Sequence, residues 1–390
     1  MSKRVFLKPV KEARVLSGHP WVFQSDIDRA EKDVVNGDVV SVISARGRPL
    51  GQAVYNSKSL ITLRMLTTGD ERVTPELIKS RVVTAVSLRR QLGDMNACRL
   101  INAEADGLPA VIVDKFSDVL SVQILSLGMA GFQNEIIETL IQELQPKGIW
   151  ERNDVPVREL EGMKQQTGLL YGEVPERVEI IENGLKMLVD VKGGQKTGYF
   201  LDQKENRAAL KPYCKGARVL DICTHTGSFA LHAAMYGARE VTAVDISEHA
   251  LACAWENAQL NKFSQVNFVL ANAFDYLRDK SDRGEKYDLI VLDPPAFAKN
   301  KASLPGAVKG YKEINLRAMK MLDTGGILVT CSCSQNMVPD LFQKTILEAS
   351  RDARVTIQQL EWRGAGKDHP SLPASGETHY LKCGIFRVLR

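Results

Sequence analysis

The hydrophobic pattern is most regular in the second half of the chain, where short apolar runs alternate with segments of helical periodicity. The runs that we expect to be strands are Arg218–Ile222, Val241–Asp245, Val266–Leu270, Asp288–Leu292 and Gly326–Thr330. The clearest helices are expected at Ser228–Tyr236, Glu248–Asn261 and Tyr311–Leu322. Strands that alternate with helices predict an α/β domain built on a parallel, doubly wound sheet.

The end of the chain departs from this rhythm. Val355–Trp362 and Tyr380–Leu389 both have the character of strands, and the Gly364–Gly376 loop between them carries no helical pattern. Two strands joined in this way predict an antiparallel hairpin at the sheet. A purely parallel nucleotide-binding sheet has no such pair. The pattern therefore favours the sheet of a methyltransferase over that of a dehydrogenase.

The first half of the chain contains two further patterns. In residues 1–72, short β-rich runs separated by turn clusters predict strands at Val39–Ser44, Gly51–Tyr55 and Ile61–Leu66. Residues 73–184 predict a mixed α+β unit, with helices at Glu76–Gln91 and Phe132–Leu144, strands at Ala110–Val113, Val119–Leu125 and near Ile149–Glu151, and turns between Gly162 and Arg177. We therefore expect three domains, namely residues 1–72, 73–184 and 185–390.

Composition narrows the class of protein. The 390 residues are 44% hydrophobic and 25% charged, which is typical of globular proteins, and the net charge of +4 is compatible with a polyanionic partner without requiring one. Seven cysteines without a CxxC pair indicate neither a disulfide framework nor a metal site. The N-terminus lacks the apolar stretch of a signal peptide, and no run approaches the ~20 apolar residues of a membrane span. We expect a cytoplasmic protein with no metal and no membrane partner.

The first strand of the α/β domain leads into a candidate cofactor site. It ends in Asp221-Ile222-Cys223-Thr224-His225-Thr226-Gly227-Ser228, and Asp245 follows 18 residues after Gly227, at the end of the second strand. Ligands of open α/β sheets bind at the carboxyl ends of strands, where an acidic residue can accept hydrogen bonds from ribose hydroxyls. A single glycine after a strand is common, and the GxGxxG fingerprint of dinucleotide sites is absent. Together with Asp245, the loop favours an adenosyl methyl donor over NAD.

Asn272 ends the third strand, where the adenine edge would lie. Its side chain can accept a hydrogen bond from the exocyclic amine and donate one to the ring. It can equally cap the helix that follows. The sequence leaves both roles open.

The fourth and fifth strands end in residues suited to chemistry on a base. Asp293-Pro294-Pro295 follows the fourth strand, and two prolines there either hold Asp293 against a flat base or simply stiffen the loop. Cys331 and Cys333 end the fifth strand, in the same expected cleft. A thiolate that adds to carbon 6 of a pyrimidine makes carbon 5 nucleophilic enough to be methylated. The alternative is that these cysteines are merely buried and inert. Alternation along an extended strand would put both sulfurs on the same side, so the spacing does not show which of the two is the nucleophile.

Several strings occur together in order along nearly the whole chain, namely His19-Pro20-Trp21-Val22-Phe23, Glu104-Ala105-Asp106-Gly107-Leu108-Pro109, Lys196-Thr197-Gly198-Tyr199-Phe200-Leu201-Asp202-Gln203, Asp293-Pro294-Pro295-x-Phe297, Gly310-Tyr311-Lys312-Glu313-Ile314-Asn315 and Ser332-Cys333-Ser334. With them the chain resembles the bacterial large-subunit ribosomal RNA cytosine-C5 methyltransferases of the class I, PUA-containing type. The resemblance implies an N-terminal PUA domain that binds RNA, a small α+β linker domain and a Rossmann-like catalytic domain that uses S-adenosyl-L-methionine.

The resemblance also implies roles for individual residues. Cys333 would be the nucleophile, and Asp293 would hydrogen-bond the edge of the cytosine ring and help to polarise it. The residues implied at the cofactor are Phe200, Asp202, Gln203, Asp221, Gly227, Asp245, Asn272 and Asp293. The chain departs from the family pattern at Cys331, which adds a second thiol, and at Asn272, which replaces the usual aspartate.

The expected partner is ribosomal RNA of the large subunit (23S rRNA, free or within a particle), with a homodimer as a possible assembly. Cations ahead of two aromatic residues are expected to contact phosphates, namely Lys3, Arg4, Lys8, Lys11 and Arg14. We expect Trp21 and Phe23 to form the core of this module rather than to stack on bases. Two alternatives remain, an rRNA methyltransferase acting on guanine N7 or an exocyclic amine without a thiol, and an RNA-binding assembly factor without activity. The modified nucleotide is not identified by the sequence.

Overall fold

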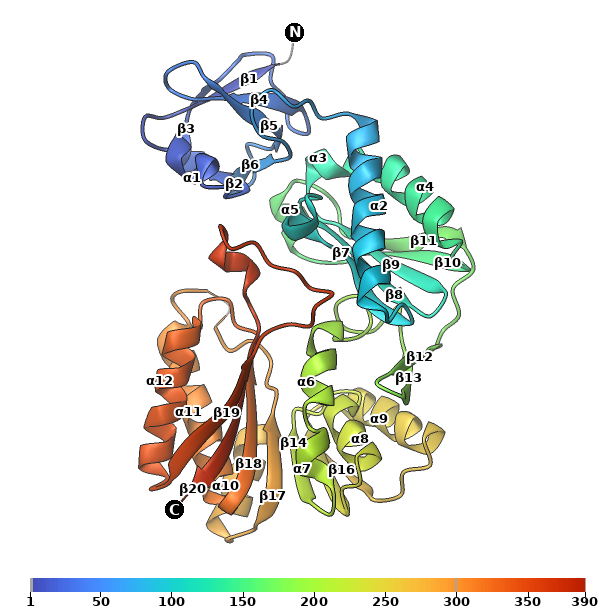
Figure 1. Cartoon of the computed structure of the whole chain (residues 1–390), viewed down its shortest axis with the longest axis vertical. Helices are drawn as coiled ribbons and strands as arrows, with labels where there is room; N and C mark the ends of the chain where they lie inside the picture. Colours follow the sequence, from blue (N-terminus) through green and yellow to red (C-terminus); the bar gives the residue numbers. More distant parts are fainter. Residues whose placement is uncertain (1–2, 299, 390) are drawn as a thin grey trace. The chain divides into compact units, whose positions relative to one another are not determined.

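The computed structural model describes residues 3–298 and 300–389, and the chain forms two compact units (Figure 1). The first unit contains the described residues up to Ile180, together with 189–201 and 367–378. The second unit contains 181–188, 202–366 and the described residues from 379 onward. Within the described part of the chain, no helix is long and apolar enough to cross a membrane.

The N-terminal part of the first unit is a six-stranded sheet (Figure 1). In sheet order its strands are β2 (Trp21–Phe23), β6 (Ile61–Met65), β5 (Pro49–Tyr55), β4 (Val39–Ile43), β1 (Arg4–Leu7) and β3 (Ile27–Ala30), with the short helix α1 (Glu12–Leu16) after β1. The three strands predicted here, β4, β5 and β6, are confirmed. Strands β1, β2 and β3 span only three or four residues each, too few to show a clear alternation.

The core of this sheet is aliphatic, and the prediction that Trp21 and Phe23 form it is wrong. The buried residues are Val5, Leu7, Val15, Val22, Val40, Val42, Leu50, Ala53 and Leu63. The Trp21 ring is half-buried, and its Nε1 donates a hydrogen bond to Oε1 of Glu104 at 2.8 Å. The Phe23 ring, also half-buried, lies 4.6 Å from the guanidinium of Arg14. Both rings therefore make polar contacts at the margin of the sheet.

Four of the five cations expected at RNA pair with acids in this unit. The ion pairs are Lys3–Asp38 at 2.7 Å, Arg4–Glu31 at 2.7 Å, Lys11–Asp26 at 3.0 Å and Arg14–Glu377 at 3.3 Å. Lys8 donates to the carbonyl of Ser25 at 2.8 Å. Exposed pairs of this kind contribute little to stability, so a phosphate can compete for the cations. Their contact with RNA stays a prediction.

The central part of the first unit is a five-stranded sheet covered by two helices. In sheet order its strands are β11 (Gln166–Gly172), β10 (Gly148–Asn153), β9 (Val119–Ile124), β8 (Val111–Phe116) and β7 (Ala97–Asn102). The helices are α2 (Pro75–Leu92) and α4 (Gln133–Leu144), with the short α3 (Leu127–Ala130) and α5 (Val157–Leu160). Both predicted long helices and the predicted strands are confirmed. Strand β11, where turns were expected, is a correction, because it is mostly exposed and carries no apolar alternation.

A segment from the end of the chain also belongs to the first unit. Residues 367–376 lie in the predicted loop before the last strand, and Asp368 among them bonds to the central sheet and to α2. The carboxylate of Asp368 accepts from the backbone N–H of Arg99 at 2.8 Å, and its carbonyl accepts from Arg89 at 2.8 Å. The loop therefore has fixed partners in this unit.

The second unit is built on a seven-stranded sheet (Figure 1). In sheet order its strands are β16 (Val266–Leu270), β15 (Glu240–Asp245), β14 (Arg218–Ile222), β17 (Tyr287–Leu292), β18 (Leu322–Ser332), β20 (Lys382–Leu389) and β19 (Thr356–Arg363). The first five run parallel to one another, and β20 is antiparallel to both of its neighbours. The predicted doubly wound sheet and its terminal antiparallel pair are both confirmed.

Helices pack on both faces of this sheet because its central strands are apolar on both sides. One core contains buried residues of α10 (Ala273–Asp282), α11 (Leu304–Lys320) and α12 (Pro339–Asp352). The core on the other face contains residues of α7 (Lys211–Cys214) and α8 (Ser228–Met235). The remaining elements are α6 (Lys204–Ala208), α9 (Glu248–Leu260) and the hairpin strands β12 (Val178–Glu182) and β13 (Leu185–Val189), where the chain passes between the units. The parallel strands whose carboxyl ends carry the candidate site are therefore packed between helices on both faces of the sheet.

Candidate active site

Three of the predicted site residues lie at the carboxyl ends of neighbouring parallel strands. Asp221 is the last residue but one of β14, Asp245 is the last residue of β15, and Asp293 directly follows β17. Ile222 of β14 is level with Leu292 of β17, which in turn is level with Thr330 of β18. This register brings the loops that carry the carboxylates and the Ser-Cys-Ser string to one edge of the sheet, as predicted.

The turn between β14 and α8 is tightly wound. Cys223 and His225 have φ values of 65° and 51°, and Gly227, which precedes α8, has a φ of 83°. Left-handed backbone at residues other than glycine is uncommon and gathers at functional sites. A Cβ on Gly227 would lie 3.1 Å from Cβ of Ala254, so glycine also gives the helix room to pack. The structure therefore places Gly227 in the turn, where its positive φ and the close Ala254 favour glycine, and its part in holding the cofactor stays a prediction.

Asp221 is fully buried at the base of this turn. Its Oδ2 accepts hydrogen bonds from the Thr224 hydroxyl at 2.5 Å and from the Ala230 backbone N–H at 3.0 Å. Burial, with smaller contributions from the charges of Asp293 and Asp245, raises the pKa of Asp221 to about 7. The Oδ1 atom of Asp221 and the hydroxyl of Thr226 are buried, and neither has a hydrogen-bond partner among the described residues.

These features fit a cationic ligand. Buried polar atoms without partners are costly and mark places where a ligand completes the hydrogen bonding. Three carboxylates gathered at one edge repel one another, and a positive charge between them removes that cost. S-adenosylmethionine carries a sulfonium and an ammonium group, so the donor set suits it.

The carboxylate of Asp245 is held by backbone amides on both sides. Its Oδ2 accepts from the N–H of His225 at 2.8 Å and its Oδ1 from the N–H of Ser247 at 2.9 Å. Each oxygen retains a second lone pair, and the side chain is half-buried. The geometry therefore leaves Asp245 able to accept from a pair of ribose hydroxyls while it fixes the turn.

Asn272 caps helix α10, which was one of its two predicted roles. Its Oδ1 accepts from the N–H of Phe274 at 2.9 Å and from that of Asp275 at 3.4 Å. The carbonyl oxygen is thus directed into the first turn of the helix. The side-chain amide alone remains to donate toward a ring nitrogen.

Gln203 and Asp202 lie in the second unit, at the start of α6. Nε2 of Gln203 donates to Oδ1 of Asp293 at 2.9 Å, while its Oε1 accepts from Asn206 at 2.6 Å. Asp202 is buried and accepts from the hydroxyl of Tyr380 at 2.6 Å. Gln203 thus contacts the residue predicted to bind the base, a contact that the sequence did not reveal.

Phe200 belongs to the first unit, where its ring is half-buried and lies 4.4 Å from Nζ of Lys196. Its role at the cofactor, implied by the resemblance, stays a prediction.

The Asp-Pro-Pro loop and the Ser-Cys-Ser loop are joined. The hydroxyl of Ser334 accepts from the backbone N–H of Ala298 at 3.2 Å and is 3.0 Å from the hydroxyl of Tyr311. Tyr311 also accepts from the hydroxyl of Ser332 at 3.0 Å. The ring of Phe297, in the Asp-Pro-Pro loop, packs against that of Tyr311 with 4.7 Å between the ring centroids. Tyr311 therefore fixes both residues that flank Cys333.

The structure separates the two thiols that spacing left undecided. The inference that both lie on one side of a strand is wrong, because β18 ends at Ser332 and Cys333 lies in the loop beyond it. Cys331 is fully buried opposite Cys383, and a hydrogen bond between the two thiols, together with burial, raises the pKa of Cys331 well above its usual value. Cys333 is only half-buried. Cys333 is therefore the accessible thiol of the pair.

A lysine close to this thiol was not predicted. Lys382 begins β20, is 2% exposed, and donates from Nζ to the carbonyl of Ser334 at 2.7 Å. Its place beside Cys333 follows from the antiparallel pairing of β20 with β18, and no local motif marks it in the sequence.

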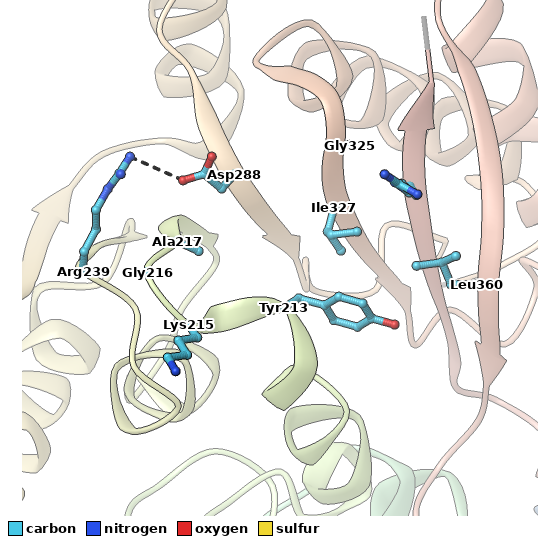
Figure 2. A pocket seen from close by; sticks show the side chains of 10 residues that line it. Tyr213, Lys215, Gly216, Ala217, Arg239, Asp288, Gly325, Ile327 and Leu360 are labelled. Carbon is cyan, nitrogen blue, oxygen red and sulfur yellow. Dashed lines mark hydrogen bonds and ion pairs between the residues drawn. The ribbon is translucent and has the colours of Figure 1, made fainter.

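A pocket at the opposite edge of the sheet is separate from these residues (Figure 2). It is lined near the amino ends of β14, β17 and β18 by Tyr213, Lys215, Gly216, Ala217, Arg239, Asp288, Gly325, Ile327, Leu360 and Arg387. Arg239 and Asp288 form an ion pair at 3.4 Å there. Ligands of open α/β sheets bind at the carboxyl ends, so this pocket is not the candidate active site.

Comparison with known proteins gives family matches over most of the chain. Residues 163–387 match the family model of S-adenosylmethionine-dependent methyltransferases, and residues 5–68 match that of PUA-like domains. The chain is 42% identical over 397 aligned positions to ribosomal RNA large subunit methyltransferase I of Tolumonas auensis, with all of both chains covered. It is 40% identical over 396 positions to the protein of the same name from Shewanella denitrificans, again with full coverage.

Solved structures share the fold. A chain from Streptococcus mutans, described as a candidate S-adenosylmethionine-dependent methyltransferase, aligns with a TM-score of 0.84 at 22% identity, covering 99% of this chain and all of that one. A structure described as that of a candidate methyltransferase complexed with S-adenosylhomocysteine aligns with a TM-score of 0.85, at the same identity and coverage. The architecture is thus a PUA-like β domain, a central α/β domain and a Rossmann-like methyltransferase domain.

Proposed function

Since this chain belongs to the ribosomal RNA large subunit methyltransferase I family, we propose that it methylates carbon 5 of a cytosine in large-subunit ribosomal RNA. The chain is an S-adenosylmethionine-dependent methyltransferase with an N-terminal PUA-like domain. The RNA is proposed from the names of full-length relatives, and the position on the base from the chemistry of the site. The finer step that we propose is a covalent adduct between Cys333 and carbon 6 of the cytosine.

The observation that carries the proposal is the placement of Cys333. Its thiol is half-buried in the loop beyond β18, and Ser334 ties this loop to the one that contains Asp293. A methyltransferase that attacks a ring nitrogen or an exocyclic amine has no need for a thiol, because those atoms are already nucleophilic. Carbon 5 of cytosine is not, and a thiol beside the base-binding loop answers that requirement.

The residues of the chain divide the reaction into easier steps. The Cys333 thiolate donates its electron pair to carbon 6, and the electrons of the 5,6 double bond make carbon 5 an enamine-like nucleophile. S-adenosylmethionine, when bound, would supply the methyl group: a bond forms between carbon 5 and the methyl carbon, and the methyl–sulfur bond breaks with its electron pair left on the sulfur of a neutral thioether. A base then removes the proton from carbon 5, the double bond re-forms, and the thiolate leaves carbon 6. Asp293, held by Gln203, hydrogen-bonds the edge of the ring and favours addition at carbon 6.

The cofactor would be held by the carboxyl edge of the sheet. Asp221 and its neighbour Asp293 supply negative charge for the cationic groups, and Asp245 accepts from the ribose hydroxyls. The turn around Gly227 provides the close approach of backbone. Asn272 contributes through its amide while its oxygen caps α10.

Trapping of the covalent adduct tests the proposal. Fluorine on carbon 5 cannot leave as the proton does, so large-subunit ribosomal RNA transcribed with 5-fluorocytidine should remain bound to the protein in a denaturing gel when S-adenosylmethionine is present. Cys333→Ala should form no such complex and should produce no 5-methylcytosine by mass spectrometry of the RNA. Cys331→Ala is the matched control and should form both.

A different result would redirect the assignment. If Cys333→Ala methylates the RNA at the wild-type rate, the thiol is not the nucleophile, and an exocyclic amine or guanine N7 becomes the target. If Cys331→Ala loses the adduct and Cys333→Ala retains it, the proposal names the wrong sulfur.

A further inference from the structure

Lys382 is a buried cation whose partners are neutral. It is 2% exposed, and its ammonium donates to the carbonyls of Ser334 at 2.7 Å and Tyr380 at 2.8 Å. Carbonyl dipoles solvate an ammonium group without neutralising its charge. An ammonium has three donors, so two carbonyls leave one proton for a further acceptor. A buried cation normally persists only where another group compensates its charge.

The sheet places this cation beside the Cys333 thiol. In the antiparallel ladder between β18 and β20, Lys382 lies directly opposite Ser332, the residue before Cys333. Its hydrogen bond to Ser334 reaches the residue after Cys333. Backbone pairing at Ser332 and the hydrogen bond from the ammonium to Ser334 therefore connect Lys382 to the loop on either side of Cys333.

The electrostatics of the loop agree with this placement. Burial lowers the pKa of Lys382 to about 8, and the charge of the Cys333 thiolate acts in the opposite direction. The Tyr311 hydroxyl, on α11, is also close to this thiol. Burial raises the pKa of Tyr311, and the charge of the Cys333 thiolate raises it further. Asp293, in the loop joined to this one, is a third ionisable group of the site. Of these groups Lys382 is the cation, because the other two are a phenol and a carboxylate.

We propose that Lys382 is the resident cation that stabilises Cys333 as a thiolate, and that it acts as a positioning residue for the reaction of that thiol. Attraction between the two charges is mutual, so an ammonium that the thiolate stabilises also favours the thiolate over the thiol. The inference deepens the proposed function, on which its relevance to methylation rests. It names the source of the nucleophile's activation.

Alkylation of Cys333 in the full chain measures this effect without RNA or cofactor. The rate of modification by iodoacetamide follows the thiolate fraction, and mass spectrometry of the peptide containing Cys333 gives that rate from pH 6 to pH 10. In the wild-type chain the inflection should lie below about 8.5, the ordinary value for cysteine. In Lys382→Met, which replaces the charge with an unbranched apolar chain, it should rise by one pH unit or more, with alkylation at pH 7 slower by about tenfold. Lys382→Arg, which retains the charge, should restore part of the shift.

Controls within the chain separate this role from a structural one. Cys253 on α9 is half-buried, and its alkylation should follow the same pH profile in all three proteins. An equal change at both cysteines would indicate loss of structure instead. An unchanged Cys333 profile in Lys382→Met, or a wild-type inflection at or above that of ordinary cysteine, would overturn the inference. The second of these outcomes needs no variant, so it holds even if the variants fail to fold.

Failure of the inference and failure of the proposed function look different. If Lys382→Met shifts the alkylation profile while Cys333→Ala still methylates RNA, the lysine tunes a thiol that is not the nucleophile. If the profile is unchanged while Cys333→Ala is inactive, the thiol is the nucleophile and another group activates it. Where both hold, the pH at which methylation reaches half of its maximal kcat should rise in Lys382→Met and move back in Lys382→Arg.

Discussion

Nε2 of Gln203 donates a hydrogen bond to Oδ1 of Asp293 at 2.9 Å, and this contact joins α6 to the loop that follows β17. Oε1 of Gln203 accepts from Asn206, which fixes which end of the amide faces the carboxylate. The carboxylate of Asp293 is therefore oriented by a side chain whose own orientation is set by a neighbour. Preorganised donors and acceptors of this kind require no rearrangement when a base arrives.

Replacement of Gln203 by leucine should slow methylation more than it weakens cofactor binding. The substitution removes a hydrogen bond to a charged group, which contributes about 1.5–3 kcal/mol, so kcat is expected to fall roughly 10- to 100-fold. Single-turnover methylation and isothermal titration calorimetry with S-adenosylmethionine would measure the two effects. Gln259→Leu on the exposed side of α9 is the matched control. A loss confined to cofactor affinity would remove Gln203 from base positioning.

The affinity for S-adenosylmethionine should rise with pH between 6 and 8. Burial raises the pKa of Asp221 to about 7, so below that pH the free site holds a proton that a cationic ligand displaces. Each pH unit below the pKa should then weaken binding by up to about tenfold, and above it the affinity should level off. Calorimetry in buffers of different ionisation enthalpy would detect the proton released near pH 7. A dissociation constant that does not change over this range would show that binding of the ligand does not displace a proton from Asp221.

Most of the catalytic fold could be predicted because its strands are buried on both faces. Such strands are continuous apolar runs, and β14 and β16 begin and end where the pattern placed them. Strand β11 was missed because its seven residues are mostly exposed and lack an apolar period. Helix α10 was expected only as the helix after Asn272, without bounds, because Leu277 is its only fully buried residue within the described part of the chain. Helix α12, which was not among the predicted helices, does carry a helical pattern, with a proline in its first turn and an apolar face.

From the sequence pattern, the residues of the candidate site could be predicted only where they lie at the carboxyl ends of the parallel strands. Asp221, Asp245 and Asp293 each follow from the rule that ligands bind at the carboxyl edge. The distinction between Cys331 and Cys333 depends on the residue at which β18 ends, and boundaries are the least certain part of any pattern. Lys382 lies beside the Ser-Cys-Ser loop because β20 pairs with β18, and no local pattern encodes this pairing with a distant segment.

Asp245→Ala should weaken S-adenosylmethionine binding by about 1–3 kcal/mol, the usual cost of leaving buried polar groups without partners. Part of this loss would come from the turn, because the same carboxylate accepts from the N–H groups of His225 and Ser247. Calorimetry would give the dissociation constant, and Asp275→Ala at an exposed position of α10 is the matched control. If binding were unchanged, Asp245 would have no contact with the cofactor.

Stability at mildly acidic pH should depend on His232. This imidazole is fully buried on α8, with Nδ1 2.7 Å from the carbonyl of Ser228 and Nε2 3.6 Å from a carboxylate oxygen of Glu182. Burial lowers its pKa to about 4; the charge of Arg207 also lowers it, and that of Glu182 opposes the shift. The native chain therefore keeps the imidazole neutral at pH values where the unfolded chain binds a proton.

The sign of the effect follows from this difference in proton binding. Above the ordinary histidine pKa of 6.5, neither state is protonated and the contribution of His232 is fully present. As the pH falls from 6.5 toward 4, His232 binds a proton in the unfolded state but not in the native state. The free energy of unfolding therefore decreases by up to ~3 kcal/mol. Thermal unfolding followed by circular dichroism at pH 7.5, 6 and 5 should show a steeper fall in Tm for the wild type than for His232→Gln. The exposed His249→Gln is the matched control and should follow the wild type. Parallel curves for the wild type and His232→Gln would mean that His232 titrates alike in both states, which its complete burial argues against.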